Sequence, residues 1–195
     1  MAFVVIYDAC VLYPAPMRDF LVRLALTPLV SARWTERILS ECFDSIARNR
    51  TDLPTERLDR TRSRMCGALP QAMVRGYDDL ISGLVLPDPD DRHVLAAAIR
   101  AGAQTIVTFN TKDFPSCVLD TYQIEARHPD DFVVDQIDIN PGVIVKILQE
   151  QAAALRRNTV SASRVIANLR RNGLVQSTAR LRLLFGDMFT EPDVW

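Results

Sequence analysis

The feature that most constrains the fold is a short, uninterrupted apolar run at residues 3–7, FVVIY, which ends directly at Asp8. β-Branched and aromatic residues without polar alternation are typical of a strand that is buried on both faces. Such strands occur in parallel sheets that helices cover on both sides. The run therefore predicts an α/β fold. In open α/β sheets, ligands bind beyond the carboxyl ends of the strands, which is where Asp8 lies.

Two later segments predict a helix followed by a second strand. Residues 91–101 repeat apolar side chains at helical spacing, beginning at Asp91. Residues 104–109 form another strand-like run, and Asp113 follows it. Short connections between these elements are typical of α/β proteins. We therefore expect Asp8 and Asp113 to lie on the same rim of a sheet.

The remaining segments predict helices. Residues 33–48 have apolar residues at helical spacing, with Glu41 at the edge of the apolar face. Pro54 and Pro70 suit the first turns of two further helices, which run to about residues 69 and 81. After Pro141 the pattern is helical only, over about residues 143–157, 161–171 and 177–185. We expect a first domain over residues 1–138 and a C-terminal helical extension over residues 139–195.

The amino-acid composition and the cysteine spacing indicate the cellular compartment. Of the 195 residues, 48% are hydrophobic and 24% are charged, which is the balance of a folded soluble protein. The cysteines have no Cys-x-x-Cys spacing and apolar neighbours, which is typical of reduced core thiols: Cys10, Cys42, Cys66 and Cys117. The apolar start is too short for a signal peptide or a membrane span. We expect a cytoplasmic protein with no membrane association.

Charge is unevenly distributed although the net charge is only −1. Between Gln151 and Gly186 there are arginines and no acids: Arg156, Arg157, Arg164, Arg170, Arg171, Arg180 and Arg182. These side chains are candidates for phosphate contacts, and the alternative is a solvated helical face. The helix, glycine break and helix over residues 161–183 are also compatible with a helix-turn-helix or with a surface for a protein partner.

Four acids from separate segments are candidates for one metal site: Asp8, Glu41, Asp91 and Asp113. Carboxylates at close range repel each other unless a cation compensates their charge. Because His93 and His128 are too isolated to form a ligand pair, the donors are oxygens, which favour Mg²⁺ or Mn²⁺ over zinc. Such a site activates water and shields a phosphodiester under attack.

Each acid also has a structural interpretation. Asp91 is well placed to cap the helix that it opens, and Asp8 is compatible with a turn. Glu41 alone is compatible with a solvated helix residue, and Asp113 with shaping its loop. Asp88 and Asp90 suit the turn before the helix. The functional interpretation therefore depends on the combination of acids.

The stretches that carry these acids, taken in order, resemble the PIN-domain family. They are VVIYDACVL, WTERILSE, LPDPDDRHVLAAA and IVTFNTKDFP, at residues 4–12, 34–41, 86–98 and 106–115. The resemblance implies a three-layer α/β/α domain with a central parallel sheet, and metal-dependent hydrolysis of RNA. The C-terminal helices are similar to extensions on some bacterial VapC-type toxins. That similarity implies a cognate antitoxin as partner, and homodimers are common in the family.

The family's first three acids correspond to Asp8, Glu41 and Asp91. At the fourth, Asn110 stands where many members have an aspartate, and Asp113 lies three residues further on. The resemblance thus implies that Asp8, Asp91 and Asp113 bind Mg²⁺ or Mn²⁺, that Asn110 offers a neutral oxygen, and that Glu41 acts through water.

Other functions remain open at this stage. A phosphatase of the haloacid dehalogenase type needs a second aspartate where Cys10 stands, and a receiver domain needs a lysine for which Lys112 is only a rough candidate. A PIN-like protein with an impaired metal site, binding RNA or a partner without cutting, is consistent with Asn110. A housekeeping RNA-processing nuclease would differ only in its biological role.

Overall fold

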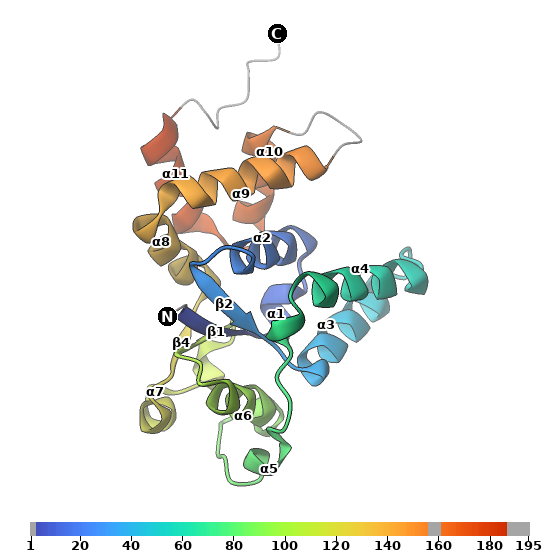
Figure 1. Cartoon of the computed structure of the whole chain (residues 1–195), viewed down its shortest axis with the longest axis vertical. Helices are drawn as coiled ribbons and strands as arrows, with labels where there is room; N and C mark the ends of the chain where they lie inside the picture. The colour runs from blue at the N-terminus through green and yellow to red at the C-terminus, as the bar shows by residue number, and fades with distance from the viewer. Residues whose placement is uncertain (1–2, 156–160, 187–195) are drawn as a thin grey trace.

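The protein is described here by a computed structural model, in which residues 3–155 and 161–186 are placed (Figure 1). Its centre is a sheet of four parallel strands in the order β2-β1-β3-β4. The strands are β1 (Phe3–Tyr7), β2 (Val30–Arg33), β3 (Thr105–Val107) and β4 (Glu125–Arg127). The buried run at residues 3–7 therefore forms a central strand, as predicted.

Helices cover both faces of this sheet (Figure 1). One side carries α1 (Ala9–Leu12) and α2 (Ala15–Ala25), and α1 packs on the hairpin of α3 (Glu36–Asn49) and α4 (Thr55–Ala68). The other side carries α5 (Asp78–Ile81), α6 (Arg92–Ala101) and α7 (Ser116–Leu119). Helix α6 packs on both β1 and β3, and Asp91 at its N-terminus is near enough to Asp8, directly after β1, for their charges to interact. The predicted three-layer α/β/α architecture is confirmed.

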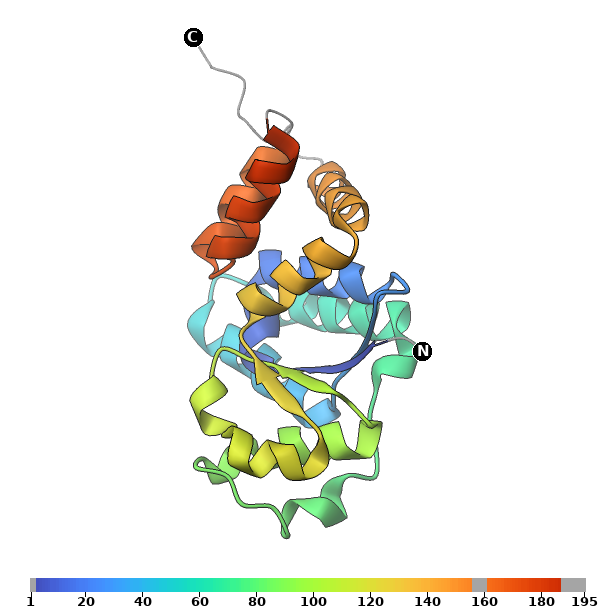
Figure 2. The ribbon, with the colours of Figure 1, turned by 90° about the vertical axis from the view of Figure 1, so that its left-hand side faces the viewer.

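The C-terminal part is all-helical, as predicted for the segments after Pro141, whereas the helix over Pro129–Ile139 was not predicted. It comprises α8 (Pro129–Ile139), α9 (Pro141–Ala154), α10 (Ala162–Arg171) and α11 (Val175–Phe185). Figure 2 shows these helices stacked at one end of the molecule, where α9 and α10 pack on α2 and α11 packs on α8. Their buried side chains, such as Leu148 and Ile166, belong to the same hydrophobic cluster as Ile6 and Trp34. The extension thus shares the core of the sheet domain.

Two strands were not predicted. The segment assigned to the start of a helix at residue 33 is the end of β2, and α3 begins only after Thr35, whose side chain accepts a hydrogen bond from the Ile38 amide. The short β2 pairs with β1 along its whole length. Strand β4 has the polar sequence EAR and lies at the edge of the sheet. Neither segment has the apolar run that identifies β1.

The single helix predicted from Pro70 to residue 81 is wrong. The chain forms a 3₁₀ turn at Pro70–Ala72, and Met73 then makes a parallel bridge to Trp34. Gly76 follows with φ of +68°, a conformation that glycine adopts without steric cost. Because of this extended, glycine-containing link, only the short helix α5 forms near the end of the segment.

The cysteine prediction holds in part. All four thiols are free, and Cys42 is buried, but Cys117 is exposed and is therefore not a core residue. Arg156 and Arg157, two of the candidate phosphate contacts, lie outside the described residues. Within residues 3–155 and 161–186, no helix combines the length and the apolar character that crossing a membrane requires.

Candidate active site

Asp8 follows β1 and is held by three hydrogen bonds. Its Oδ1 accepts from the Ala9 amide at 2.6 Å, which makes Asp8 the N-cap of α1. Its Oδ2 accepts from Thr108 Oγ1 at 2.7 Å and from Cys10 Sγ at 3.2 Å. The residue is only 6% exposed. Asp8 therefore has a structural role at the turn, and its carboxylate is also fixed at the carboxyl end of a central strand.

Thr108 was not predicted as a site residue. Tyr7 pairs with Val107 in the sheet, so Asp8 and Thr108 are the first residues after two neighbouring strands. The Thr108 hydroxyl also accepts a hydrogen bond from the Asn110 amide at 3.0 Å. One side chain thus connects Asp8 to the loop that carries Asn110. The predicted strand-like run, residues 104–109, includes Thr108, and because the observed strand ends at Val107 its position at the strand end could not be read from the sequence.

Cys10 connects the same two segments through its thiol. Sγ accepts a hydrogen bond from the Phe109 amide at 3.3 Å and lies 3.3 Å from Thr108 Oγ1. Burial, reinforced by the charge of Asp8, raises the pKa of Cys10 to about 12. The thiol therefore stays protonated at neutral pH and acts as a hydrogen-bonding group beside Asp8, not as a nucleophile.

Asp91 lies at the entrance of α6 in a strongly acidic environment. It occupies the N-cap position of α6, as its structural interpretation predicts, but its side chain makes no capping hydrogen bond. Burial, followed by the charges of Asp8, Asp88 and Asp113, raises the pKa of Asp91 to about 6. The fold thus brings negative charges from the β1 end, the turn before α6 and the loop after β3 close enough to repel one another.

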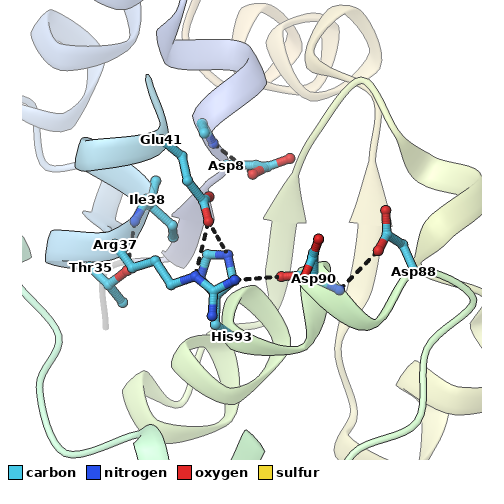
Figure 3. A network of polar contacts seen from close by, with 9 residues as sticks. Asp8, Thr35, Arg37, Ile38, Glu41, Asp88, Asp90 and His93 are labelled. Carbon is cyan, nitrogen blue, oxygen red and sulfur yellow. Dashed lines mark hydrogen bonds and ion pairs between the residues drawn. The ribbon is translucent and has the colours of Figure 1, made fainter. Parts of the chain in front are cut away.

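Glu41 extends from α3 toward α6 and contacts two side chains, Arg37 of α3 and His93 of α6 (Figure 3). Its Oε1 accepts from Arg37 Nε at 3.0 Å and lies 3.1 Å from Nε2 of the buried His93. Burial raises the pKa of Glu41, but the interactions with His93 and Arg37 outweigh it and the pKa is lowered. Glu41 is therefore an ionised, oriented carboxylate and not a freely solvated one. His93 was interpreted only as a structural residue, so this contact was missed.

The remaining predicted residues lie on the loop after β3 and on the turn before α6. Asp113 ends a 3₁₀ turn at Thr111–Asp113 and is partly exposed, and Asn110 directly precedes that turn and is exposed. Asp88 stabilises its turn as expected, since Oδ1 accepts from the Asp90 amide at 2.9 Å. It also contributes to the negative potential at Asp91, which had not been expected.

The four predicted acids do not form a preformed metal-binding site. Among the residues that the structure describes, no three His, Cys, Asp or Glu side chains are close enough to hold one metal ion. The set nevertheless fits a hard cation in its chemistry, because the donors near Asp91 are carboxylate oxygens, and after burial it is their repulsion that raises its pKa. A divalent cation relieves that repulsion. The ligand set itself remains a prediction.

A pocket of about 620 Å³ opens beside these residues, between α1 and α3. It is lined by Cys10 and Glu41 from the candidate site and by polar groups further along α3: Asp44, Ser45, Arg48 and Asn49. A second cavity of about 640 Å³ lies between α2 and α4, and none of the four acids lines it. Glu41 and Cys10, the hydrogen-bond partner of Asp8, are therefore accessible from this first pocket.

Comparison with known families matches two parts of the chain. The PIN domain profile matches residues 4–112, which is more than half of the chain. The protein therefore belongs to the PIN-domain family. A second profile, the VapC50 C-terminal domain, matches residues 129–183 and so includes α8 to α11 up to residue 183.

One curated relative is named "Putative ribonuclease VapC50" and comes from Mycobacterium tuberculosis. The chain is 52% identical to it over 71 residues, which is 36% of this chain and 41% of the relative. The match thus spans less than half the length of that relative. No solved structure matches the chain significantly.

Proposed function

We propose that this protein is a divalent-metal-dependent endoribonuclease, the toxin of a VapBC-type toxin–antitoxin pair. The observation that carries this proposal is the raised pKa of Asp91, about 6, caused by burial and by Asp8, Asp88 and Asp113 at the carboxyl edge of a PIN-family sheet. The VapC50 C-terminal profile and the named relative support the toxin assignment. The implied partners are RNA and a cognate antitoxin, with a homodimer as a further expectation, and the expected compartment is the cytoplasm.

In this proposal Asp8, Asp91 and Asp113 hold a Mg²⁺ or Mn²⁺ ion, and Asn110 adds a neutral oxygen. The bound cation would lower the pKa of water and shield the negative charge of the phosphodiester. Glu41 is ionised beside His93 and Arg37, so it can accept a hydrogen bond from the attacking water and orient it. Thr108 and Cys10 keep Asp8 in place. In-line attack then leaves a 5′-phosphate on one RNA product.

The division into a nuclease domain over residues 1–138 and an extension over residues 139–195 belongs to the same proposal. We assign the exposed arginines of the extension to contacts with RNA phosphates: Arg164, Arg170, Arg171 and Arg182. Arg180 is a weaker candidate because its Nη2 is 3.1 Å from Asp138 Oδ1, so part of its charge is already compensated.

A second candidate is a PIN-fold protein that binds RNA or a partner without cutting it. Two observations favour it: Asn110 replaces the aspartate of many family members, and no three acids of the described residues gather to hold a metal. Metal-dependent turnover separates this candidate from the nuclease.

The test is cleavage of a mixed RNA pool by antitoxin-free protein in Mg²⁺ or Mn²⁺, with EDTA as the control. The nuclease predicts cutting that EDTA stops and that Asp91→Asn abolishes. Asp59→Asn, an exposed acid on α4, is the matched control and should cut like the unmodified protein. If folded, metal-supplied protein leaves the pool intact, the binding function is favoured instead.

A further inference from the structure

The turn between α10 and α11 packs against the loop that follows β3. Gly173 lies in this turn with φ of +100°, and a Cβ at that position would be 2.9 Å from Cε1 of Phe109 and 3.3 Å from Cζ. Since 2.9 Å is far shorter than normal carbon–carbon contact, only glycine lets the turn approach the ring this closely. Phe109 stands between Thr108 and Asn110, so this contact reaches the candidate site from the extension.

The turn is anchored on its own side by a buried acid. Asp130 of α8 is only 3% exposed, and its two oxygens accept hydrogen bonds from the first amides of α11 and from the Ser177 hydroxyl, at 2.7 to 3.0 Å. The α8 helix follows directly after β4, whose Arg127 carbonyl accepts a hydrogen bond from the Thr108 amide at 3.0 Å. The turn and the loop after β3 are therefore tied to the same strand.

The Phe109 ring is also held by His128, at the N-cap of α8. The two rings meet edge to face with centroids 5.2 Å apart. The ring therefore contacts Gly173 of the extension and His128 of the segment that joins the extension to the sheet. A shift of the extension would displace the ring, because it has a close neighbour on both of these elements.

The backbone amides of Phe109 and Asn110 are connected to Asp8 through hydrogen bonds. The Phe109 amide donates to Cys10 Sγ at 3.3 Å, and the Asn110 amide donates to Thr108 Oγ1 at 3.0 Å. Both Cys10 and Thr108 donate in turn to Asp8. A displacement that moves the Phe109 backbone would therefore strain the hydrogen bonds that hold the Asp8 carboxylate.

We propose that Gly173 is a positioning residue for the candidate active site. The extension holds the Phe109 ring and thereby fixes Thr108 and Asn110 relative to Asp8. The C-terminal helices are thus part of the catalytic unit and more than an accessory for binding partners. The effect of Gly173 on catalysis rests on the proposed function, whereas its effect on the Phe109 loop does not.

The test compares Gly173→Ala with Gly102→Ala in the full-length chain. Gly102 also has a positive φ, of +59°, but a Cβ there would meet nothing within 4 Å, so it controls for adding a methyl group at a left-handed glycine without a new contact. Amide hydrogen exchange at Phe109 and Asn110 should be about tenfold faster in Gly173→Ala and unchanged in Gly102→Ala. Mn²⁺ affinity and kcat should fall about tenfold or more in Gly173→Ala only.

A double variant keeps the test decisive if Gly173→Ala is poorly folded. Phe109→Leu removes the ring atoms that the new methyl group would meet, so Gly173→Ala should have a much smaller further effect in that background. Equal effects in both backgrounds, or unchanged exchange at Phe109 and Asn110 in folded Gly173→Ala, would overturn the proposal. If no variant cuts RNA, the proposed function fails, and the exchange data still decide the coupling.

Discussion

Thr108 Oγ1 donates a hydrogen bond of 2.7 Å to Oδ2 of Asp8, across the carboxyl ends of the two central strands β1 and β3. The Asp8 carboxylate is thus supported by the neighbouring strand and not only by its own turn. Polar partners of this kind orient the side chains that bind a metal, and losing one typically reduces metal affinity or activity by about 10- to 100-fold.

Replacing Thr108 by valine removes this donor while nearly preserving the side-chain volume. We expect cation affinity and RNA cleavage to fall about 10- to 100-fold in Thr108→Val, because Asp8 loses one of its three hydrogen bonds. Thr108→Ser retains the hydroxyl and should stay close to the unmodified protein. Equal activities of the valine and serine variants would show that the hydroxyl has no such role.

His93 should control the ionisation of Glu41. In His93→Phe the contact at 3.1 Å is lost, so burial is opposed only by Arg37 and the pKa of Glu41 should rise. An NMR titration of the Glu41 carboxyl measures this shift directly. His93→Gln, which retains a hydrogen-bond donor, is the matched control. A Glu41 pKa that is the same in His93→Phe and in the unmodified protein would contradict the assignment.

The raised pKa of Asp91 predicts a pH dependence of stability in EDTA. Its pKa moves from 3.8 to about 6, so the folded protein binds the proton more tightly than the unfolded chain does. Stability should therefore fall as pH rises from about 4 to about 6, and level off above that range. Asp91→Asn should lack this fall and be more stable at pH 7 by about 1 kcal/mol, a value reduced for the partial exposure of the residue. Urea unfolding of both proteins at about pH 4 and at pH 7 measures these stabilities. An Asp91→Asn variant that is less stable than the unmodified protein at pH 7 would contradict the prediction.

The buried Asp130 should matter far more for stability than its exposed neighbour Asp131. Asp130→Ala leaves the first amides of α11 and the Ser177 hydroxyl without their acceptor. We expect the free energy of unfolding to fall by about 2–4 kcal/mol. Asp131 accepts one hydrogen bond, from Gln176, so Asp131→Ala should change the free energy of unfolding by less than about 0.5 kcal/mol. Similar urea midpoints for both variants would refute the anchoring role.

The sequence was informative at several segments where burial leaves a periodic pattern, although α2 and α8, which also bury residues at helical spacing, were not predicted. The apolar runs predicted β1 and β3, and helical spacing predicted α6 and the helices of the extension. Strands β2 and β4 were not predicted because VSAR and EAR contain polar residues and form no apolar run, and β4 is specified by its pairing with β3. Local sequence therefore predicted the central elements but not the edges of the sheet.

The candidate site was predictable only as far as strand ends identify it. Asp8 and Asp113 were proposed from this position, and Asp91 and Glu41 from their places on predicted helices. Thr108 has the same position after β3 as Asp8 has after β1. The contact of Glu41 with His93 depends on how α3 and α6 pack. The approach of Gly173 to Phe109 depends on how the extension folds back over the domain, which no local pattern encodes.

The central claim is that the acids around Asp91 bind a divalent cation, and a calorimetric titration of antitoxin-free protein with Mn²⁺ tests it most directly. The account predicts binding by the unmodified protein and by Asp59→Asn, with affinity at least about tenfold weaker in Asp91→Asn. Folded protein that does not bind Mn²⁺, or that binds it equally well after Asp91→Asn, would contradict the account.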